Sequence, residues 1–229
     1  NPILGMEAYV APAGLESKSR DSYHLLLLAE NLEGYRNLCK LASISALQGF
    51  YGKPRIDHKT LRKHSQGLIS TTTCLSSEVC SALLKGDLKK ARVTAELYVD
   101  IFGKDNYFVE LQDHGIADQQ AIYPHLKTLA KELKLGTVVT NDAHYLRRED
   151  AVPHDVLLCI QTGSVRSSDK RMKFDGQEFY VKTPGEMAAA FPDDIDALER
   201  TGDVAARCNV ELELGRAPMP IPRTPEGVG

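Results

Sequence analysis

The stretch TVVTNDAHYL, residues 137–146, decides how the rest of the sequence is interpreted. Its β-branched start predicts a buried strand over residues 135–141, and Asp142 and His144 come at the end of that strand. In an extended chain, residues two apart point to the same side, so this carboxylate and this imidazole can converge on one point. That pattern is typical of metal binding or acid–base catalysis, if other ligands come from elsewhere in the chain.

Length and composition are those of a globular protein with one large domain or two small ones. The chain has 229 residues, of which 42% are hydrophobic and 26% are charged. The net charge of −3 excludes an overall basic surface for DNA, so any contact with nucleic acid would be local, metal-assisted or made by another domain. No apolar run approaches the roughly 18 residues of a membrane helix, so we expect no membrane contact. Five scattered cysteines without a CxxC motif predict a reducing, cytoplasmic compartment.

Strands are expected to alternate with helices along the first 160 residues. The predicted strands cover residues 3–10, 23–29, 67–73, 106–112 and 135–141. The predicted helices cover residues 31–47, 59–64 (with Asp57 as N-cap), 76–85, 88–102, 118–133 and 147–161. This alternation indicates βα units and a parallel sheet or barrel. Beyond residue 163 we expect a hairpin or strand, a helix with Pro184 near its start, a last helix over residues 195–208 and a proline-rich linker.

Polar residues gather in these strands or where they end. They are Glu7, His24, Cys74, Glu110, Asp113, His114, Asp142 and His144. Ligands bind at the carboxyl ends of strands in barrels and doubly wound sheets, so a shared site is expected there. A mixed set of carboxylate, imidazole and thiolate suits Zn²⁺, or Mn²⁺ and Fe²⁺ where carboxylates dominate. A cluster of such ions would activate water and clamp a phosphate for hydrolysis.

Several of these residues also have a purely structural interpretation. Taken alone, Cys74 is more often a small buried residue, and His24 is more often a packed or capping histidine. Glu7 could equally pair with a buried Arg or Lys, and Asp113 with His114 could simply form a turn. Further expectations are that His58, His64 and His125 are solvated, that His154 packs, and that Cys39, Cys80, Cys159 and Cys208 lie in the core.

Seven segments, in order over essentially the whole chain, carry a resemblance to a known family. They are GMEAYVAP (5–12), YHLLLLAEN (23–31), GFYGKPRID (49–57), GLISTTTCLSSEV (67–79), YFVELQDHG (107–115), VVTNDAHYLRRED (138–150) and FDGQEFYVKTPGEM (174–187). Together they resemble the polymerase and histidinol phosphatase (PHP) domain, the amino-terminal region of bacterial DNA polymerase III alpha subunits.

The resemblance implies an α/β fold, a distorted seven-stranded β/α barrel of the TIM-like type. It also implies a divalent metal site, with Zn, Mn or a mixed cluster, at the carboxyl ends of the strands. Glu7, His24, Cys74, Asp142 and His144 match family metal-ligand positions, and Asp142 and His144 are the expected catalytic residues. The family does not clearly support Glu110, Asp113 or His114, although His114 remains a candidate near the site.

The resemblance also divides the chain. Residues 1–162 are expected to form the PHP barrel without its amino-terminal part, residues 163–210 its carboxyl-terminal part, and residues 211–229 a linker toward the polymerase palm. The family opens with an HxH strand and a TDHG-type motif, and neither occurs here. We therefore expect the true start to lie upstream, strand 3–10 to have an unpaired edge, and the isolated chain to be inactive and poorly soluble or oligomeric.

Three functions follow as expectations. The first is part of the replicative DNA polymerase III alpha subunit, a DNA-directed DNA polymerase, with a metal-dependent 3′–5′ proofreading exonuclease site in the PHP region. The second is a structural module that binds partners and keeps metal for stability only. The third is a free-standing phosphoesterase, against which FDGQEFYVKTPGEM and the proline-rich tail argue. The implied partners are DNA at the primer 3′ end, the rest of the alpha subunit, and the sliding clamp with other replisome subunits.

Overall fold

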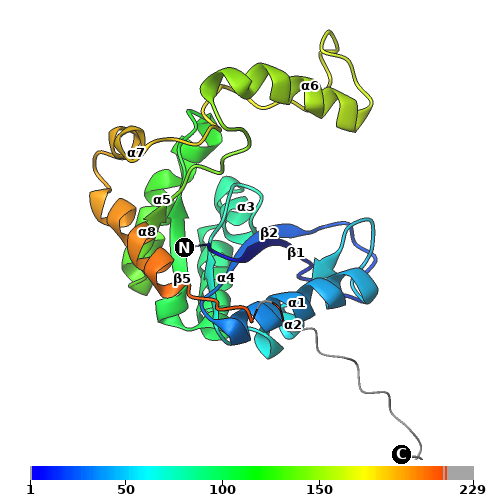
Figure 1. Cartoon of the computed structure of the whole chain (residues 1–229), viewed down its shortest axis with the longest axis vertical. Coiled ribbons are helices and arrows are strands. Elements are labelled where there is room, and N and C mark those ends of the chain that lie inside the picture. The colour runs from blue at the N-terminus through cyan, green and yellow to red at the C-terminus, as the bar shows by residue number, and fades with distance from the viewer. Residues whose placement is uncertain (1, 214, 216–229) are drawn as a thin grey trace, which may run out of the picture.

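The computed structural model describes residues 2–213 and 215, so the expected linker over residues 211–229 lies mostly outside the described residues. Six strands form one mixed sheet in the order β3-β1-β2-β4-β5-β6 (Figure 1). The strands are β1 (Gly5–Val10), β2 (Tyr23–Ala29), β3 (Arg55–Ile56), β4 (Leu68–Thr71), β5 (Tyr107–Leu111) and β6 (Thr137–Val139). The helices are α1 (Leu32–Leu47), α2 (His58–Lys63), α3 (Glu78–Leu84), α4 (Leu88–Phe102), α5 (Ala117–Leu133), α6 (Ala151–Thr162), α7 (Pro184–Ala190) and α8 (Ile195–Arg207).

The expectation of a parallel sheet is correct for three strand pairs, β1–β3, β4–β5 and β5–β6, and wrong for the two pairs that β2 makes. Helices connect β4, β5 and β6, and these strands pair in parallel, as βα units require. β2 pairs antiparallel with both β1 and β4. The connection between β1 and β2, residues 11–22, contains no helix, so the chain turns back and the two strands pair as neighbours in opposite directions.

The free edges of the sheet lie elsewhere than expected. β1 is not an edge strand, because β3 pairs with it through Tyr9 opposite Arg55 and Val10 opposite Ile56. β3 has two residues, too few for sequence periodicity to reveal. Within the described residues the sheet is open, with β3 and β6 at its two ends, so a closed barrel is not established.

Most predicted helices are present and begin where their capping residues indicate. Asp57 caps α2 and accepts a hydrogen bond from the backbone N–H of Thr60, and Thr183 caps α7 ahead of Pro184. The hairpin or strand expected between residue 163 and α7 is wrong. Within the described residues 163–183, the only β-type pairing is a single bridge from Tyr180 to Tyr145, a residue that comes before α6.

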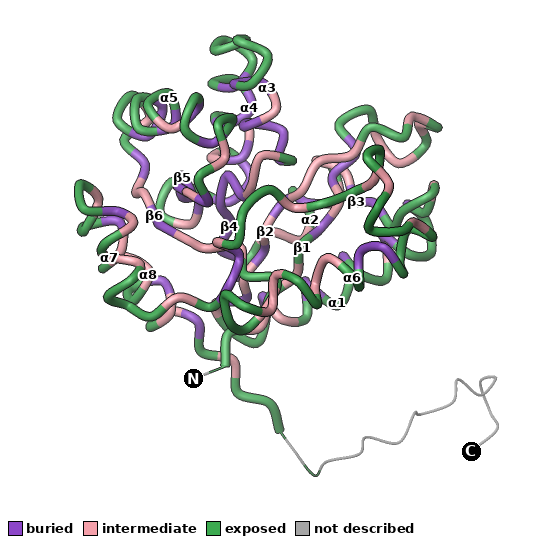
Figure 2. Tube along the Cα trace, turned by 90° about the horizontal axis from the view of Figure 1, so that it is seen from above, coloured by how far each residue is buried: buried purple, intermediate pink, exposed green. Residues whose placement is uncertain are grey.

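The core surrounds the middle of the sheet. β4 and β5 are buried along their whole length, and Figure 2 shows the buried positions concentrated there. Cys80, Cys159 and Cys208 are buried as expected, whereas Cys39 is exposed. The buried residues of α1 form a stripe that includes Leu38 and Leu41, and Cys39 lies outside it.

Helix α6 projects from the body of the molecule (Figure 1).

Among the described residues, no helix is both long enough and apolar enough to cross a lipid bilayer.

Candidate functional site

One pocket is lined by all five residues that match family metal-ligand positions. They are Glu7, His24, Cys74, Asp142 and His144. The pocket has a volume of about 380 Å³, and its other walls include Gln112, Gln119, Phe174 and Phe179. These side chains come from β1, from β2 and from the segments that follow β4, β5 and β6, so the sheet gathers residues far apart in the sequence.

Glu7, His24 and Cys74 form the first group of donors. The antiparallel register of β1 and β2 places Tyr9 opposite His24, and Glu7 is the next residue of β1 on the same face. His24 Nδ1 lies 2.8 Å from Glu7 Oε1 and 3.5 Å from Cys74 Sγ. The backbone N–H of His24 donates to the carbonyl of Ser76, which ties the segment after β4 to β2.

The electrostatics of this group favour a cation. Hydrogen bonding to Cys74, and then to Glu7, raises the pKa of His24 to about 10, although burial opposes the shift. The same contact with His24 lowers the pKa of Glu7. Metal ions bind the neutral imidazole ring and the thiolate, so a divalent cation would compete with the proton that His24 carries in its charged form.

Asp142 and His144 form the second group, and they reach the pocket by a different geometry from the one expected. β6 ends at Val139, and Asp142 has φ +43°, a left-handed conformation that aspartate tolerates better than most residues. The two residues therefore do not share an extended strand. His144 Nδ1 donates to the carbonyl oxygen of Asp142 at 2.8 Å, and the backbone N–H of His144 donates to Phe179 O at 2.7 Å.

Asn141 and His114 hold the turn that contains Asp142. The side-chain amide of Asn141 donates to the carbonyls of Glu178 and Tyr180. The Nε2 atom of His114 donates to Asn141 O at 2.5 Å. His114 is 2% exposed, stacks on Phe179 and does not line the pocket, so it lies behind the site rather than in it.

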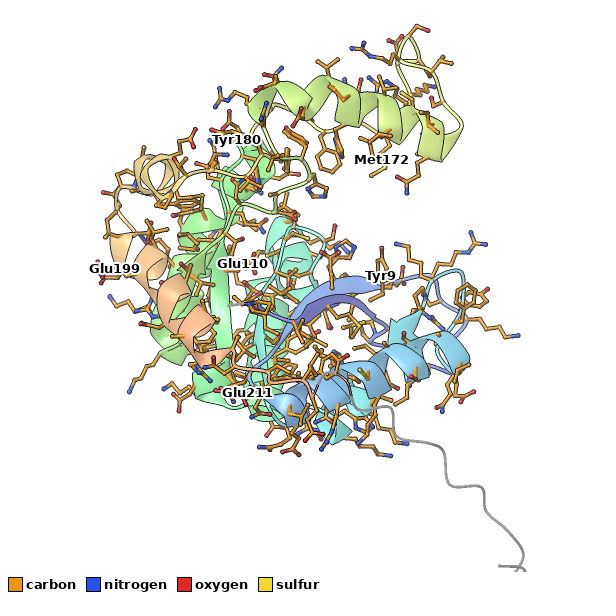
Figure 3. The ribbon with its side chains drawn as sticks, in the orientation of Figure 1. Tyr9, Glu110, Met172, Tyr180, Glu199 and Glu211 are labelled. Atoms are coloured by element: carbon orange, nitrogen blue, oxygen red, sulfur yellow. The ribbon has the colours of Figure 1, made fainter. Side chains whose placement is uncertain are left out.

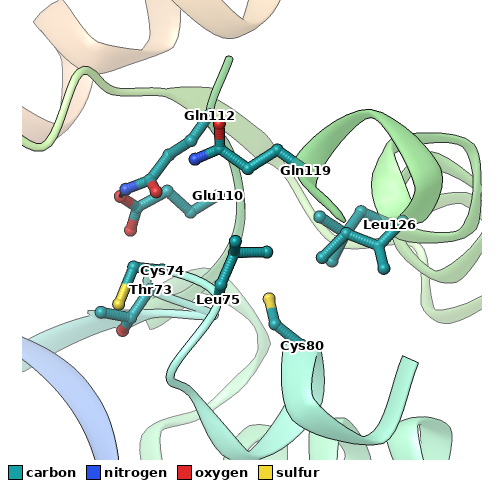
Figure 4. A pocket seen from close by; sticks show the side chains of 9 residues that line it. Thr73, Cys74, Leu75, Cys80, Glu110, Gln112, Gln119 and Leu126 are labelled. Atoms are coloured by element: carbon teal, nitrogen blue, oxygen red, sulfur yellow. Dashed lines mark hydrogen bonds between the residues drawn. The ribbon is translucent and has the colours of Figure 1, made fainter. Parts of the chain in front are cut away.

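Glu110 is a buried carboxylate that lines the same small cavity as Cys74 (Figure 4). It accepts hydrogen bonds from the hydroxyls of Thr71 and Thr140 and, at 2.9 Å, from the Nε2 atom of Gln112. Burial raises the pKa of Glu110, while these hydrogen bonds oppose the shift. The donors come from β4 and from the segments after β5 and β6, so Glu110 ties three strand ends together.

The remaining candidates have structural roles. Asp113 accepts from the backbone N–H of Gly115 at 2.8 Å and forms the turn considered above. His58 is not solvated as expected, because its Nε2 atom lies 3.0 Å from Glu78 Oε2 in a largely buried position. His154 packs edge-on against Phe174, as expected. The aromatic walls Phe174 and Phe179 were missed as site residues, although both lie in the family segment FDGQEFYVKTPGEM.

The donor types in the pocket fit a divalent cation, but the donors do not form a closed set. Carboxylates, imidazoles and one thiol are the ligands that Zn²⁺ or Mn²⁺ takes. In the part of the chain that the structure describes, no group of three or more such side chains is arranged to hold an ion. The donors instead stand as two groups that face the same pocket.

A match to a family model and matches to individual proteins agree with each other. Residues 1–114 match the family model of the PHP domain. The chain is 43% identical to DNA polymerase III subunit alpha of Deinococcus radiodurans over 99% of its length, and 42% identical to those of Treponema pallidum and Thermus aquaticus over 97%. It covers 18%, 19% and 20% of these relatives respectively, so it spans about a fifth of their length. Residues 1–114 thus match the PHP domain, and the chain is similar over nearly its whole length to one part of bacterial DNA polymerase III alpha subunits.

Proposed function

We propose that this chain is part of a DNA polymerase III alpha subunit and that its pocket is a metal-dependent 3′–5′ exonuclease site acting at the primer 3′ end. The observation that supports this most directly is that all five residues at family ligand positions line one pocket. The similarity to alpha subunits over nearly the whole chain supports a polymerase parent.

In this proposal Glu7, His24, Cys74, Asp142 and His144 hold Zn²⁺, Mn²⁺ or a mixed cluster. Bound ions of this kind supply an activated water and neutralise phosphate charge. The carbonyl oxygen of Asp142 can only accept, so Nδ1 of His144 carries the proton and a neutral ring presents its lone pair at Nε2. His144 is thus prepared either to bind a cation or to take a proton. Phe174 and Phe179 give the pocket apolar walls that limit water.

The wider architecture belongs to the same proposal. Residues 1–162 would form most of a seven-stranded barrel and residues 163–210 would complete the domain. Two contacts support this: the Tyr123 hydroxyl donates to Asp194 at 2.7 Å, and Arg200 donates to the carbonyl of Thr137 at 2.7 Å. The proposed partners are DNA, the rest of the alpha subunit, the sliding clamp and other replisome subunits, in the cytoplasm.

A second candidate is a structural module in which metal serves stability alone. It uses the same five donors and differs from the first candidate only in the role of the ion. The two candidates differ in one measurement, the degradation of a mismatched primer by a full-length protein whose polymerase aspartates are replaced.

The test compares Cys74→Ala with Cys39→Ala in that full-length protein. Cys39 is exposed on α1 and lines no part of the pocket, so it controls for the loss of a thiol. We expect Cys74→Ala to lose bound metal and at least ten-fold in Mn²⁺-supported degradation, in line with the loss of a ligand. In the protein with intact polymerase aspartates, polymerisation should be retained. Unchanged metal content would reject the site, and metal loss without any wild-type degradation would favour the structural candidate.

A further inference from the structure

We propose that a second pocket, beside the candidate metal pocket, binds backbone phosphates of single-stranded DNA, so that the substrate is a DNA strand rather than a small phosphate ester. This inference rests on the proposed function and names the form of its substrate. The second pocket has a volume of about 190 Å³ and lies against the amino-terminal half of α6 and the segment that follows this helix.

The two pockets are continuous in their walls. Lys173 and Phe174 line both of them. Figure 3 shows the nearby Met172, another wall residue of the metal pocket, beneath α6. A strand with its terminal nucleotide in the metal pocket would therefore pass Phe174 to reach the second pocket.

The charges of the two pockets are complementary. The metal pocket is lined by the carboxylates of Glu7, Asp142 and Asp175, which repel phosphate unless cations are bound. The second pocket is lined by Arg166, Arg171 and Lys173 against a single carboxylate, that of Asp155. A polyanion would be held by the second pocket while its end lies in the first.

The carboxylate of Asp155 organises this cationic wall without neutralising it. Arg171 forms a two-point contact with Asp155, at 2.5 Å and 2.9 Å, and Arg166 approaches the same carboxylate at 3.2 Å. Two guanidinium groups thus share one negative charge. Lys173 makes no hydrogen bond or ion pair within the described residues, and it is exposed at the boundary between the pockets.

The shared aromatic wall suits a nucleobase. Phe174 makes edge contacts with His144, His154 and Phe179, so it is fixed in an aromatic cluster. Aromatic side chains beside a cationic groove bind single strands by stacking, with little dependence on sequence. This local surface also agrees with the net charge of −3, which leaves no general basic face for DNA.

The test uses Lys173→Gln and Arg166→Gln in the full-length protein, with Lys170→Gln as the matched control. Lys170 is exposed in the same segment and lines neither pocket. Degradation of a single-stranded oligonucleotide is compared with hydrolysis of bis-p-nitrophenyl phosphate, a small diester without flanking nucleotides.

We expect Lys173→Gln and Arg166→Gln each to raise KM for the oligonucleotide about three- to ten-fold and to reduce the salt slope of log(kcat/KM) by about 0.7–1. Their effect on the small diester should be several-fold smaller, and Lys170→Gln should change neither substrate. An unchanged salt slope, or equal losses on both substrates, would overturn the inference.

A binding measurement separates this inference from the proposed function. A photo-crosslinking amino acid introduced as Lys173→p-benzoylphenylalanine should give an adduct with single-stranded DNA, and the same amino acid introduced as Lys170→p-benzoylphenylalanine should not. If the protein degrades neither substrate but the adduct forms, the exonuclease proposal fails and the DNA pocket stands. If no adduct with DNA forms, the pocket is not a DNA site. The same conclusion holds if an added acidic peptide prevents the DNA adduct and crosslinks in its place.

Discussion

At the scale of single residues, Glu110 shows how a buried carboxylate can support a site without entering it. Replacing it with leucine leaves the hydroxyls of Thr71 and Thr140 and the amide of Gln112 without their acceptor. We expect Glu110→Leu to lower the free energy of unfolding by about 2–4 kcal/mol, because buried unsatisfied donors are costly. Glu110→Gln keeps the shape and an acceptor oxygen, so its cost should be clearly smaller. Urea denaturation measures both, and equal losses would contradict this role.

The same residue predicts a pH dependence. Burial raises the pKa of Glu110 in the folded protein above its ordinary value of 4.5. Between these two pKa values the folded state binds more protons than the unfolded chain. The contribution of the protonated Glu110 to stability is therefore complete at low pH and is lost as pH rises. The free energy of unfolding of wild type relative to Glu110→Gln should therefore fall with increasing pH above about 4.5. Urea denaturation over a series of pH values tests this, and a difference that grows with pH would show the assignment to be wrong.

The sequence identified the site residues better than it explained them. Asp142 and His144 were selected because an extended strand would align them, yet Asp142 is left-handed and the strand ends at Val139. The turn depends on His114 and on the segment around Phe179, which are distant in sequence. His58 was assigned to the surface for a related reason, since its partner Glu78 belongs to another helix. Partners of this kind cannot be seen in local sequence.

At the scale of elements, the packing of α1 against the start of β4 depends on a close approach of two glycines. A Cβ atom on Gly34 would lie 1.8 Å from the carbonyl oxygen of Gly67, where only backbone could move aside. We expect Gly34→Ala to lower the free energy of unfolding by about 2–3 kcal/mol, as overpacking does.

Gly185 in α7 is the matched control for this substitution. A Cβ atom there would meet nothing within 4 Å, so Gly185→Ala should be neutral or stabilising by up to about 1 kcal/mol. The two variants are compared by thermal and urea unfolding. If they behave alike, the close approach of Gly34 and Gly67 does not restrict the packing of α1.

Element positions followed from the sequence, but strand direction did not. α4 was predicted residue for residue, and β2 likewise, because apolar spacing and capping residues are local signals. The antiparallel pairing of β1 with β2 depends on the lack of a helix between them, which the βα rhythm of the later chain obscured. β3 exists only through its pairing with β1, so no local pattern marks it.

At the scale of the whole molecule, α6 carries four exposed large apolar side chains, more than any other helix of the described residues. Leu157 is 62% exposed and Ile160 is 71% exposed, one turn apart on a helix that projects from the body. The edge strands β3 and β6 have only two and three residues, so they offer little unpaired backbone for pairing with another chain. Association of the isolated chain, expected from an exposed strand edge, should therefore depend on α6 instead.

This origin of association can be tested with the isolated chain, residues 1–229. Contiguous exposed apolar groups drive association, whereas single ones are common on soluble proteins. Replacing Leu157 and Ile160 together, by Leu157→Glu and Ile160→Lys, should shift the light-scattering mass toward the monomer and raise solubility several-fold. Val93→Glu on α4 is the control, because Val93 is 56% exposed yet lies on a different helix, and it should change neither property. If wild type is already monomeric at high concentration, the prediction fails outright. If the control is as effective as the double variant, added charge rather than the α6 surface governs association.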